Sequence, residues 1–245
     1  LTMFPQEIID KSVYIVRRDR LLCEESLAIF GVKPERIISV KNNEWVFAKN
    51  AYIARDPLPH NSHFGTTMRN LSVKFHKYFH LDQVKATRYC LSNRRAKYRR
   101  HLHNFDEIVK TVRKEFPSIK FEVVDDETKH LIDTAKTWAS AKLMFMPTGS
   151  NFVKNIFMHS GSVCVVALSQ DTQDETIAYS SGSHGVHVLY FVVRGMRHFV
   201  NSKDKNICDP QLAVRCIGLG IDCAKNGYWA SNESFYDCKD KTICV

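Results

Sequence analysis

The stretch AKLMFMPTGSNFVKNIFMHSGSVCVVAL, residues 141–168, decides the fold of this chain. It contains an apolar run at residues 143–146, typical of a buried strand, and then a turn of small and polar residues at 147–151. Residues 152–158 are predicted to form a short helix, and residues 161–168 are a second apolar run that we expect to be another strand. A strand, a turn, a helix and a strand in this order predict one crossover unit of a parallel sheet.

The same alternation extends upstream. We expect strands at residues 87–92 and 119–124, with one helix between them that begins after Asn104 as its cap, and a second helix after the later strand. All four strands are predicted to be parallel neighbours in one sheet with helices on both faces. The helices are expected to pack through Val112, Phe116, Leu131 and Trp138.

The remaining segments extend this α/β pattern. Strands are expected at residues 13–16, 36–40 and 45–54, with helices at residues 23–30 and 66–79. Downstream, residues 186–193 have the length of a buried strand rather than of a membrane span, and Asp209 followed by Pro210 is typical of a helix start, here through about Cys216. We therefore expect a membrane link only through an upstream anchor.

The charge of the chain favours a polyanionic partner. Lys and Arg number 35 against 26 Asp and Glu, for a net charge of +9, and residues 88–103 hold a dense basic cluster. Nucleic acid, membrane headgroups and a phosphate-bearing small molecule all fit this charge. An RNA-binding surface would need aromatic side chains that stack on bases, and only Tyr89 and Tyr98 are interleaved here, so we do not expect nucleic acid.

Cysteine usage predicts an oxidising compartment. Of eight cysteines, five lie at or after residue 208, where hydrophobic periodicity is weakest. We expect at least two disulfides among them or with the three upstream cysteines, and no zinc site, because no CxxC pair is present. Glycosylation sequons at Asn70 and Asn232 point to the same compartment. The five cysteines are Cys208, Cys216, Cys223, Cys238 and Cys244.

The turn at residues 147–151 is a candidate anion site. A strand that leads through small residues into a helix presents unpaired N–H groups and the positive end of a helix dipole. Lys154 in the first turn of that helix opposes the dipole. Either a bound phosphate offsets this conflict or Lys154 simply points to water, and the sequence leaves both alternatives open.

The same segments resemble glycosyltransferase family 61. Residues 141–168 are similar to the family's strand, His-Gly-Ala-Gly type turn, helix ending in Phe and Met, and following strand, and the likeness spans residues 13–168. Four positions depart from the pattern: Thr148 stands in place of the turn histidine, Asn151 of the second glycine, Lys154 of an asparagine and Val166 of a strand-end acid. The family's Ser-Arg pair is Ser92-Asn93 here, with Arg94 displaced by one position.

This resemblance implies a two-lobed architecture of Rossmann-like halves, known as GT-B. Residues 1–85 would be a partial N-terminal lobe whose upstream part lies outside this sequence, residues 86–200 the nucleotide-sugar-binding lobe, and residues 201–245 a cysteine-rich tail packed on the lobes. The reaction would be inverting sugar transfer from a UDP-sugar to a hydroxyl of a glycan or of a Ser or Thr side chain, with no obligatory metal or other cofactor. We expect the protein in the lumen of the Golgi or the endoplasmic reticulum.

The resemblance also suggests which residues do the chemistry. The leaving diphosphate requires positive charge or N–H dipoles, and a base must accept the proton of the acceptor hydroxyl. Candidates for the base, by residue type only, are Asp56, His60 and His63. The four departures from the family pattern also favour an alternative function, a catalytically inactive module that keeps the fold and binds glycans or protein partners. The expected diphosphate contacts are Arg94, Arg95, Arg99, Arg100, Thr148, Gly149, Ser150, Asn151 and Lys154.

Overall fold

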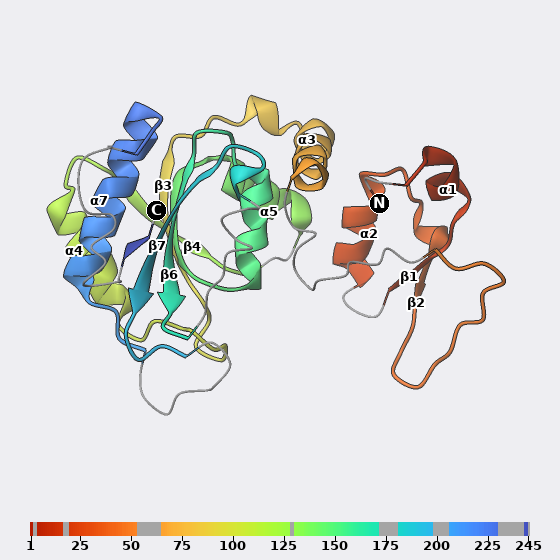
Figure 1. Cartoon of the computed structure of the whole chain (residues 1–245), viewed down its shortest axis with the longest axis horizontal. Coiled ribbons are helices and arrows are strands. Elements are labelled where there is room, and N and C mark those ends of the chain that lie inside the picture. The colour runs from red at the N-terminus through yellow and green to blue at the C-terminus, as the bar shows by residue number, and fades with distance from the viewer. Residues whose placement is uncertain are drawn as a thin grey trace.

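The structure is a computed structural model. It describes residues 1, 4–16, 20–52, 65–127, 130–171, 181–197, 206–229 and 243–244. Within these ranges the chain forms two sheets, one of two strands near the N-terminus and one of six strands that organises the rest (Figure 1). The protein is therefore of the α/β class, as the sequence predicts.

The larger sheet has the spatial order β4-β3-β5-β6-β7-β8. The first five strands pair in parallel, and β8 alone pairs antiparallel, with β7. The prediction of four parallel neighbouring strands is confirmed. In spatial order, the strands are Phe121–Asp125 (β4), Arg88–Asn93 (β3), Ala141–Pro147 (β5), Val163–Ser169 (β6), His187–Val193 (β7) and Ile243–Cys244 (β8).

Helices cover both faces of this sheet, as predicted. On one face, α4 and α7 pack through Val112 and Ile217, with Phe116, just after α4, against the same core. On the other, α3, α5 and the 3-10 helix η3 pack through Phe75, Trp138 and related side chains, as the two sides of the sheet in Figure 1 show. These helices span Phe105–Glu115 (α4), Pro210–Asn226 (α7), Thr66–Phe79 (α3), Leu131–Ala139 (α5) and Ser150–Phe157 (η3).

The central strands are apolar on both sides because both faces of the sheet are covered. In β5, Leu143 and Phe145 point to the α4 and α7 face, while Met144 and Met146 point to the α3 and α5 face. All four side chains are buried. Side chains alternate along a strand, so a continuous apolar run can fill two cores at once.

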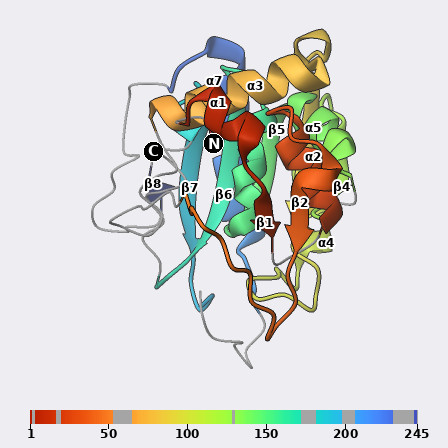
Figure 2. The same cartoon turned by 90° about the vertical axis from the view of Figure 1, so that its right-hand side faces the viewer.

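The N-terminal unit is a second, smaller parallel arrangement. Strands β1 and β2 pair in parallel, and the core beside them includes Ile9 and Phe30. Helix α3 joins the two parts, since Leu71 packs against this small core while Phe75 belongs to the larger one, and Figure 2 shows α3 crossing the top of the molecule. The elements are Gln6–Lys11 (α1), Tyr14–Val16 (β1), Arg20–Ala28 (α2), Pro34–Arg36 (η1), Ile37–Ser39 (β2) and, after α3, Leu81–Gln83 (η2).

Glu25 makes a second link between the two parts. Its carboxylate accepts a hydrogen bond from the Leu131 backbone N–H at 2.6 Å and contacts His130 Nδ1 at 3.1 Å. An acidic side chain from α2 thus satisfies a free N–H group at the start of α5, where the helix dipole also favours negative charge.

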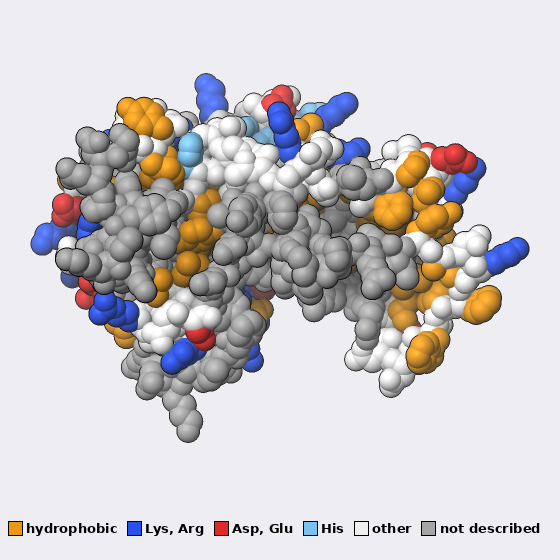
Figure 3. Space-filling model, in the orientation of Figure 1, with side chains coloured by type: hydrophobic (Ala, Val, Ile, Leu, Met, Phe, Trp, Pro, Cys, Tyr) orange, Lys and Arg blue, Asp and Glu red, His pale blue; other side chains and the backbone are white. Residues whose placement is uncertain are grey.

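The predicted strand at residues 45–54 is wrong over residues 45–52, the part that the structure describes. Trp45 and Phe47 are 96% and 97% exposed, and the segment pairs with no described strand. Apolar side chains accordingly gather on the surface of the N-terminal unit, at the right of Figure 3. An alternating pattern becomes a strand only where a neighbouring strand supplies the hydrogen bonds, and none of the described segments does so here.

Helix α7 begins as predicted but continues ten residues beyond Cys216. Asp209 caps it by accepting from the Gln211 N–H at 2.9 Å, and Pro210 is its first residue. The helix then follows an apolar stripe, through Ile217 and Ile221, along the sheet. Among the described residues no helix is both long and apolar enough to cross a bilayer.

The prediction of at least two disulfides is wrong. Six of the eight cysteines are free thiols, and the side chains of the other two, Cys238 and Cys244, lie outside the described residues, so at most one bond remains. Two buried thiols of α7, seven residues apart, lie on one face of the helix and pack as small apolar side chains in the core. The free thiols are Cys23, Cys90, Cys164, Cys208, Cys216 and Cys223.

Candidate functional site

The strand order creates a topological switch point at the carboxyl ends of β3 and β5. From β3 the chain crosses to β4 on one side, and it then returns to β5 on the other side of β3. The crossover helices α4 and α5 consequently lie on opposite faces, and the loops after β3 and β5 diverge. Open α/β sheets bind ligands at such a switch point, beyond the carboxyl ends of the strands. The residues that follow these two strands are Arg94 and Thr148.

Two guanidinium groups converge on the turn after β5. Arg94 Nη1 donates to the Thr148 carbonyl oxygen at 3.3 Å. A Cβ atom added at Gly149 would lie 1.7 Å from Arg94 Nη1 and 3.5 Å from Arg100 Nη2. Gly149 also has φ +155° and ψ 174°, a conformation almost restricted to glycine. The turn therefore requires glycine both for its backbone and for the close approach of Arg94.

Arg94 is a partly buried cation with spare hydrogen-bonding capacity. Its Nε atom is buried and has no hydrogen-bond partner in the described structure, and among the described residues it forms no salt bridge. Burial lowers the pKa of Arg94, and the nearby Asp126 carboxylate opposes that shift. The guanidinium also lies 5.8 Å from the centre of the Tyr98 ring. A desolvated guanidinium with unused donors is suited to bind an anion with two oxygens.

Asn93 closes the basic loop, residues 94–101, which carries these arginines. Its side-chain amide donates to the Leu102 carbonyl at 2.9 Å and accepts from the Leu102 N–H at 3.0 Å. These are the two backbone hydrogen bonds that a neighbouring strand would otherwise form. Its oxygen also accepts from the Arg94 N–H at 2.9 Å. Asn93 was not among the residues predicted for the site, although its position at the end of a strand could have identified it. It fixes the point at which Arg94 leaves the sheet.

The four predicted arginines separate into two kinds. Arg94 and Arg100 face the turn, as described above. Arg95 instead pairs with Asp125 at 2.8 Å and with Glu127, and its hydrogen bond holds the pKa of Asp125 below the usual value. Arg99 is exposed to solvent.

Asn151 and Lys154 both contact Asp126, which follows β4. Asn151 Nδ2 donates to Asp126 Oδ2 at 2.8 Å, and Lys154 Nζ donates to the Asp126 backbone carbonyl. Burial lowers the pKa of Lys154, and the Asp126 carboxylate partly offsets this. Of the two alternatives for Lys154, the one in which it points to water is wrong. Sequence reasoning missed Asp126, although an acidic run at a strand end was a usable signal.

The other predicted residues occupy different environments. Thr148 is fully buried, and its N–H donates to the Ala167 carbonyl at 2.8 Å, whereas Ser150 is exposed at the start of η3. The base candidates Asp56, His60 and His63 lie outside the described residues.

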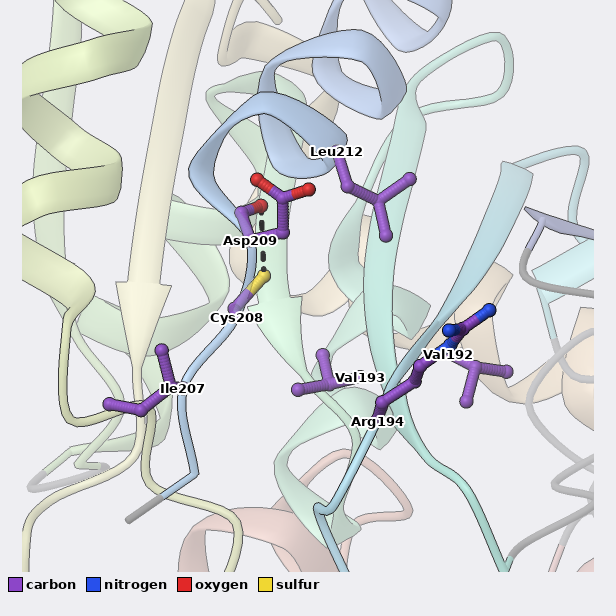
Figure 4. Close-up of a pocket in the computed structure, with 7 residues that line it drawn as sticks. All are labelled: Val192, Val193, Arg194, Ile207, Cys208, Asp209 and Leu212. Carbon is purple, nitrogen blue, oxygen red and sulfur yellow. Dashed lines mark hydrogen bonds between the residues drawn. The ribbon is translucent and has the colours of Figure 1, made fainter.

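A separate pocket of about 360 Å³ lies at the same edge of the sheet, between the end of β7 and the start of α7. Figure 4 shows it between Arg194 on the strand side and Asp209 at the helix start, with the Cys208 thiol 3.5 Å from the Asp209 carbonyl oxygen. Asn104, which follows the basic loop, connects that loop to this region. Its side-chain amide donates to the Cys208 carbonyl at 2.7 Å and accepts from the Cys208 N–H at 3.0 Å, and it makes no capping hydrogen bond to the backbone of α4. The lining residues are Val192, Val193, Arg194, Ile207, Cys208, Asp209 and Leu212.

Comparison with known proteins agrees with this geometry. A family model described as Glycosyltransferase 61 matches residues 2–165, which include the switch point and the turn at residues 148–151. No curated protein matches the chain. The match covers about two thirds of the sequence, and the chain therefore belongs to the glycosyltransferase 61 family.

Proposed function

We propose that this protein transfers a sugar from a UDP-sugar to a hydroxyl group of a glycan or of a Ser or Thr side chain, with inversion and without an obligatory metal ion. Membership of the family supports glycosyl transfer in general. The observation that carries the donor side of the proposal is the convergence of Arg94 and Arg100 on Gly149, at the switch point of the sheet.

The chemistry of inversion explains why such a turn is useful. The acceptor oxygen forms a bond to the anomeric carbon while the bond from that carbon to the diphosphate breaks, and the electron pair of the broken bond goes to UDP. Arg94 and Arg100 would stabilise the negative charge that develops on the leaving diphosphate. The first N–H groups of η3, which begins at Ser150, have no acceptor within the helix, so they would be further donors to the diphosphate. Lys154 and Asn151, both in η3, would complete the site.

A base must take the proton of the acceptor hydroxyl as the new bond forms. Asp56, His60 and His63 stay the candidates by residue type. We propose that they belong to an acceptor side built by the N-terminal unit, in a two-lobed arrangement. The parallel pairing of β1 with β2 and the flanking helices of that unit support a second Rossmann-like lobe.

The proposed compartment is the lumen of the Golgi or the endoplasmic reticulum. The six free thiols remove disulfides as a reason for it. The Asn70 sequon lies within α3, where the Ser72 hydroxyl is buried and donates to the Ile156 carbonyl at 2.8 Å, and Asn232 is outside the described residues. The compartment therefore rests on the family alone.

Binding of UDP by calorimetry tests the donor site. Arg94→Ala is expected to weaken binding by about 1.5 to 3 kcal/mol, the usual contribution of a hydrogen bond to a charged group. Arg215→Ala is the matched control, because Arg215 is exposed on α7 and its loss changes the net charge equally. Equal affinity in all three proteins would exclude Arg94 from the site, and a wild-type protein that is stabilised by RNA but not by UDP would refute the proposal.

Turnover is a separate measurement. Release of UDP from a panel of UDP-sugars, with hydroxyl acceptors present, is expected for the wild type. Binding of UDP without any release would instead support the inactive binding module, which the family match does not favour.

A further inference from the structure

One buried acid joins two of the residues that depart from the family pattern. Asp126 is 7% exposed and bonds to both Asn151 and Lys154. These two residues lie in η3, after β5, whereas Asp126 follows β4. The two strands are not neighbours, because β3 lies between them. The contacts therefore form a bridge across the end of β3, at the point where the chain turns toward Arg94.

This bridge joins the segment after β4 to the start of η3, beside the switch point. The Asn151 amide is tied to the Asp126 carboxylate at 2.8 Å, which holds the first turn of η3. The Lys154 ammonium group donates to the Asp126 carbonyl, so the Lys154 side chain is held at Asp126 instead of extending into water. The same carboxylate acts on Arg94 as an opposite charge. Asp126 thus contacts Asn151 through its carboxylate and Lys154 through its backbone carbonyl, and its charge also acts on Lys154 and Arg94.

We propose that Asp126 is a positioning residue for the donor diphosphate. Its carboxylate holds Asn151 and its backbone carbonyl accepts from Lys154, so that the turn at residues 148–151 and the Lys154 cation are in place before the ligand binds. This inference rests on the proposed function. Thr148, in place of the turn histidine, carries no charge, and Lys154, which bonds to the Asp126 carbonyl, would supply a positive charge from η3 instead.

The test compares UDP with uridine, which lacks the diphosphate. Asp126→Asn keeps the size of the side chain but removes its charge and weakens it as an acceptor for Asn151. We expect the Kd for UDP to rise by about tenfold, roughly the difference between a charge-assisted and a neutral hydrogen bond, while the Kd for uridine stays unchanged. Asp133→Asn is the matched control, because Asp133 is exposed in the first turn of α5 and the change in net charge is the same.

A second variant approaches the bridge from its other side. Asn151→Ala is expected to weaken UDP binding to a similar degree, and it keeps the test available if Asp126→Asn does not fold. The double variant should lose little more than either single one, because two residues that act through one contact are not additive.

The outcomes separate this inference from the proposed function. If the wild type does not bind UDP, both fail. If the wild type binds UDP and both bridge variants bind it equally well, only the role of Asp126 is refuted. A parallel loss of UDP and uridine affinity would show general damage to the fold and would also overturn the positioning role.

Discussion

Replacement of Gly149 by alanine tests the donor site most directly. The new Cβ would lie 1.7 Å from Arg94 Nη1 and 3.0 Å from its Cζ, far inside contact distance. The guanidinium group must therefore leave its position, and its 3.3 Å hydrogen bond to the Thr148 carbonyl is lost. The substitution disables Arg94 without altering any charge.

The expected magnitude has two parts. A non-glycine residue in this backbone conformation costs about 1 to 3 kcal/mol of folding stability. Displacement of Arg94 removes a charged hydrogen bond to the diphosphate, which is worth about 1.5 to 3 kcal/mol, or roughly a tenfold to hundredfold rise in the Kd for UDP. The first part affects stability alone and the second affects binding, so the two can be measured separately.

Gly161→Ala is the matched control for backbone strain. Gly161 also has a positive φ, of +78°, but an added Cβ would meet no atom within 4 Å. It lies before β6, at the edge of the sheet opposite the switch point. Thermal unfolding should show a loss of stability in both variants, whereas calorimetry should show weaker UDP binding for Gly149→Ala only. Unchanged UDP affinity in Gly149→Ala would refute the assignment of Arg94 to the diphosphate.

Two further predictions concern stability. An alanine Cβ at Gly220 would lie 2.8 Å from Val165 and 2.9 Å from Leu143, so we expect Gly220→Ala to lower the unfolding free energy in urea by about 1 kcal/mol despite its better helix propensity; a more stable variant would contradict this packing. Burial lowers the pKa of His76 below 6.5, with His159 and His184 acting in the same direction, so the unfolded state binds the proton first as the pH falls. Stability should therefore be full above about pH 6.5 and decrease below it, and His76→Gln should reduce that dependence in urea unfolding between about pH 8 and 5; an identical dependence in the variant would rule out His76 as its source.

The parallel sheet was predictable because its signal is local. The strands β5 and β6 are apolar at every position except Lys142 and Ser169, which occurs where both faces of a sheet are covered. Short apolar runs that alternate with helical patterns then restrict the connections to parallel crossovers. The switch point follows from the order of these elements, and the structure places the turn at residues 148–151 beside it.

The length of α7 and the state of its cysteines were not predictable from local patterns. Gly218 and Gly220 suggest the end of a helix, yet Gly220 allows α7 to approach Val165 and Leu143 closely. Cysteine clustering predicts disulfides at Cys216 and Cys223, whereas both thiols pack in the core between α7 and the sheet. In both cases the sheet beneath the helix determines the meaning of the residue, and that sheet is distant in sequence.

The candidate site shows the same limit at the level of single side chains. Arg94, Arg95 and Arg99 are chemically equivalent in the sequence, and only their partners distinguish them. Arg95 pairs with one acid at the end of β4 and one just after it, while the Asn93 side chain accepts from the Arg94 N–H. The charge available to a ligand is therefore smaller than the basic cluster suggests. It depends on which acids the strand order brings beside each cation, because a paired arginine at the surface contributes little to a new anion site. A cluster of basic residues can thus locate the edge of a sheet that binds an anion, but the side chains that bind it follow from the topology.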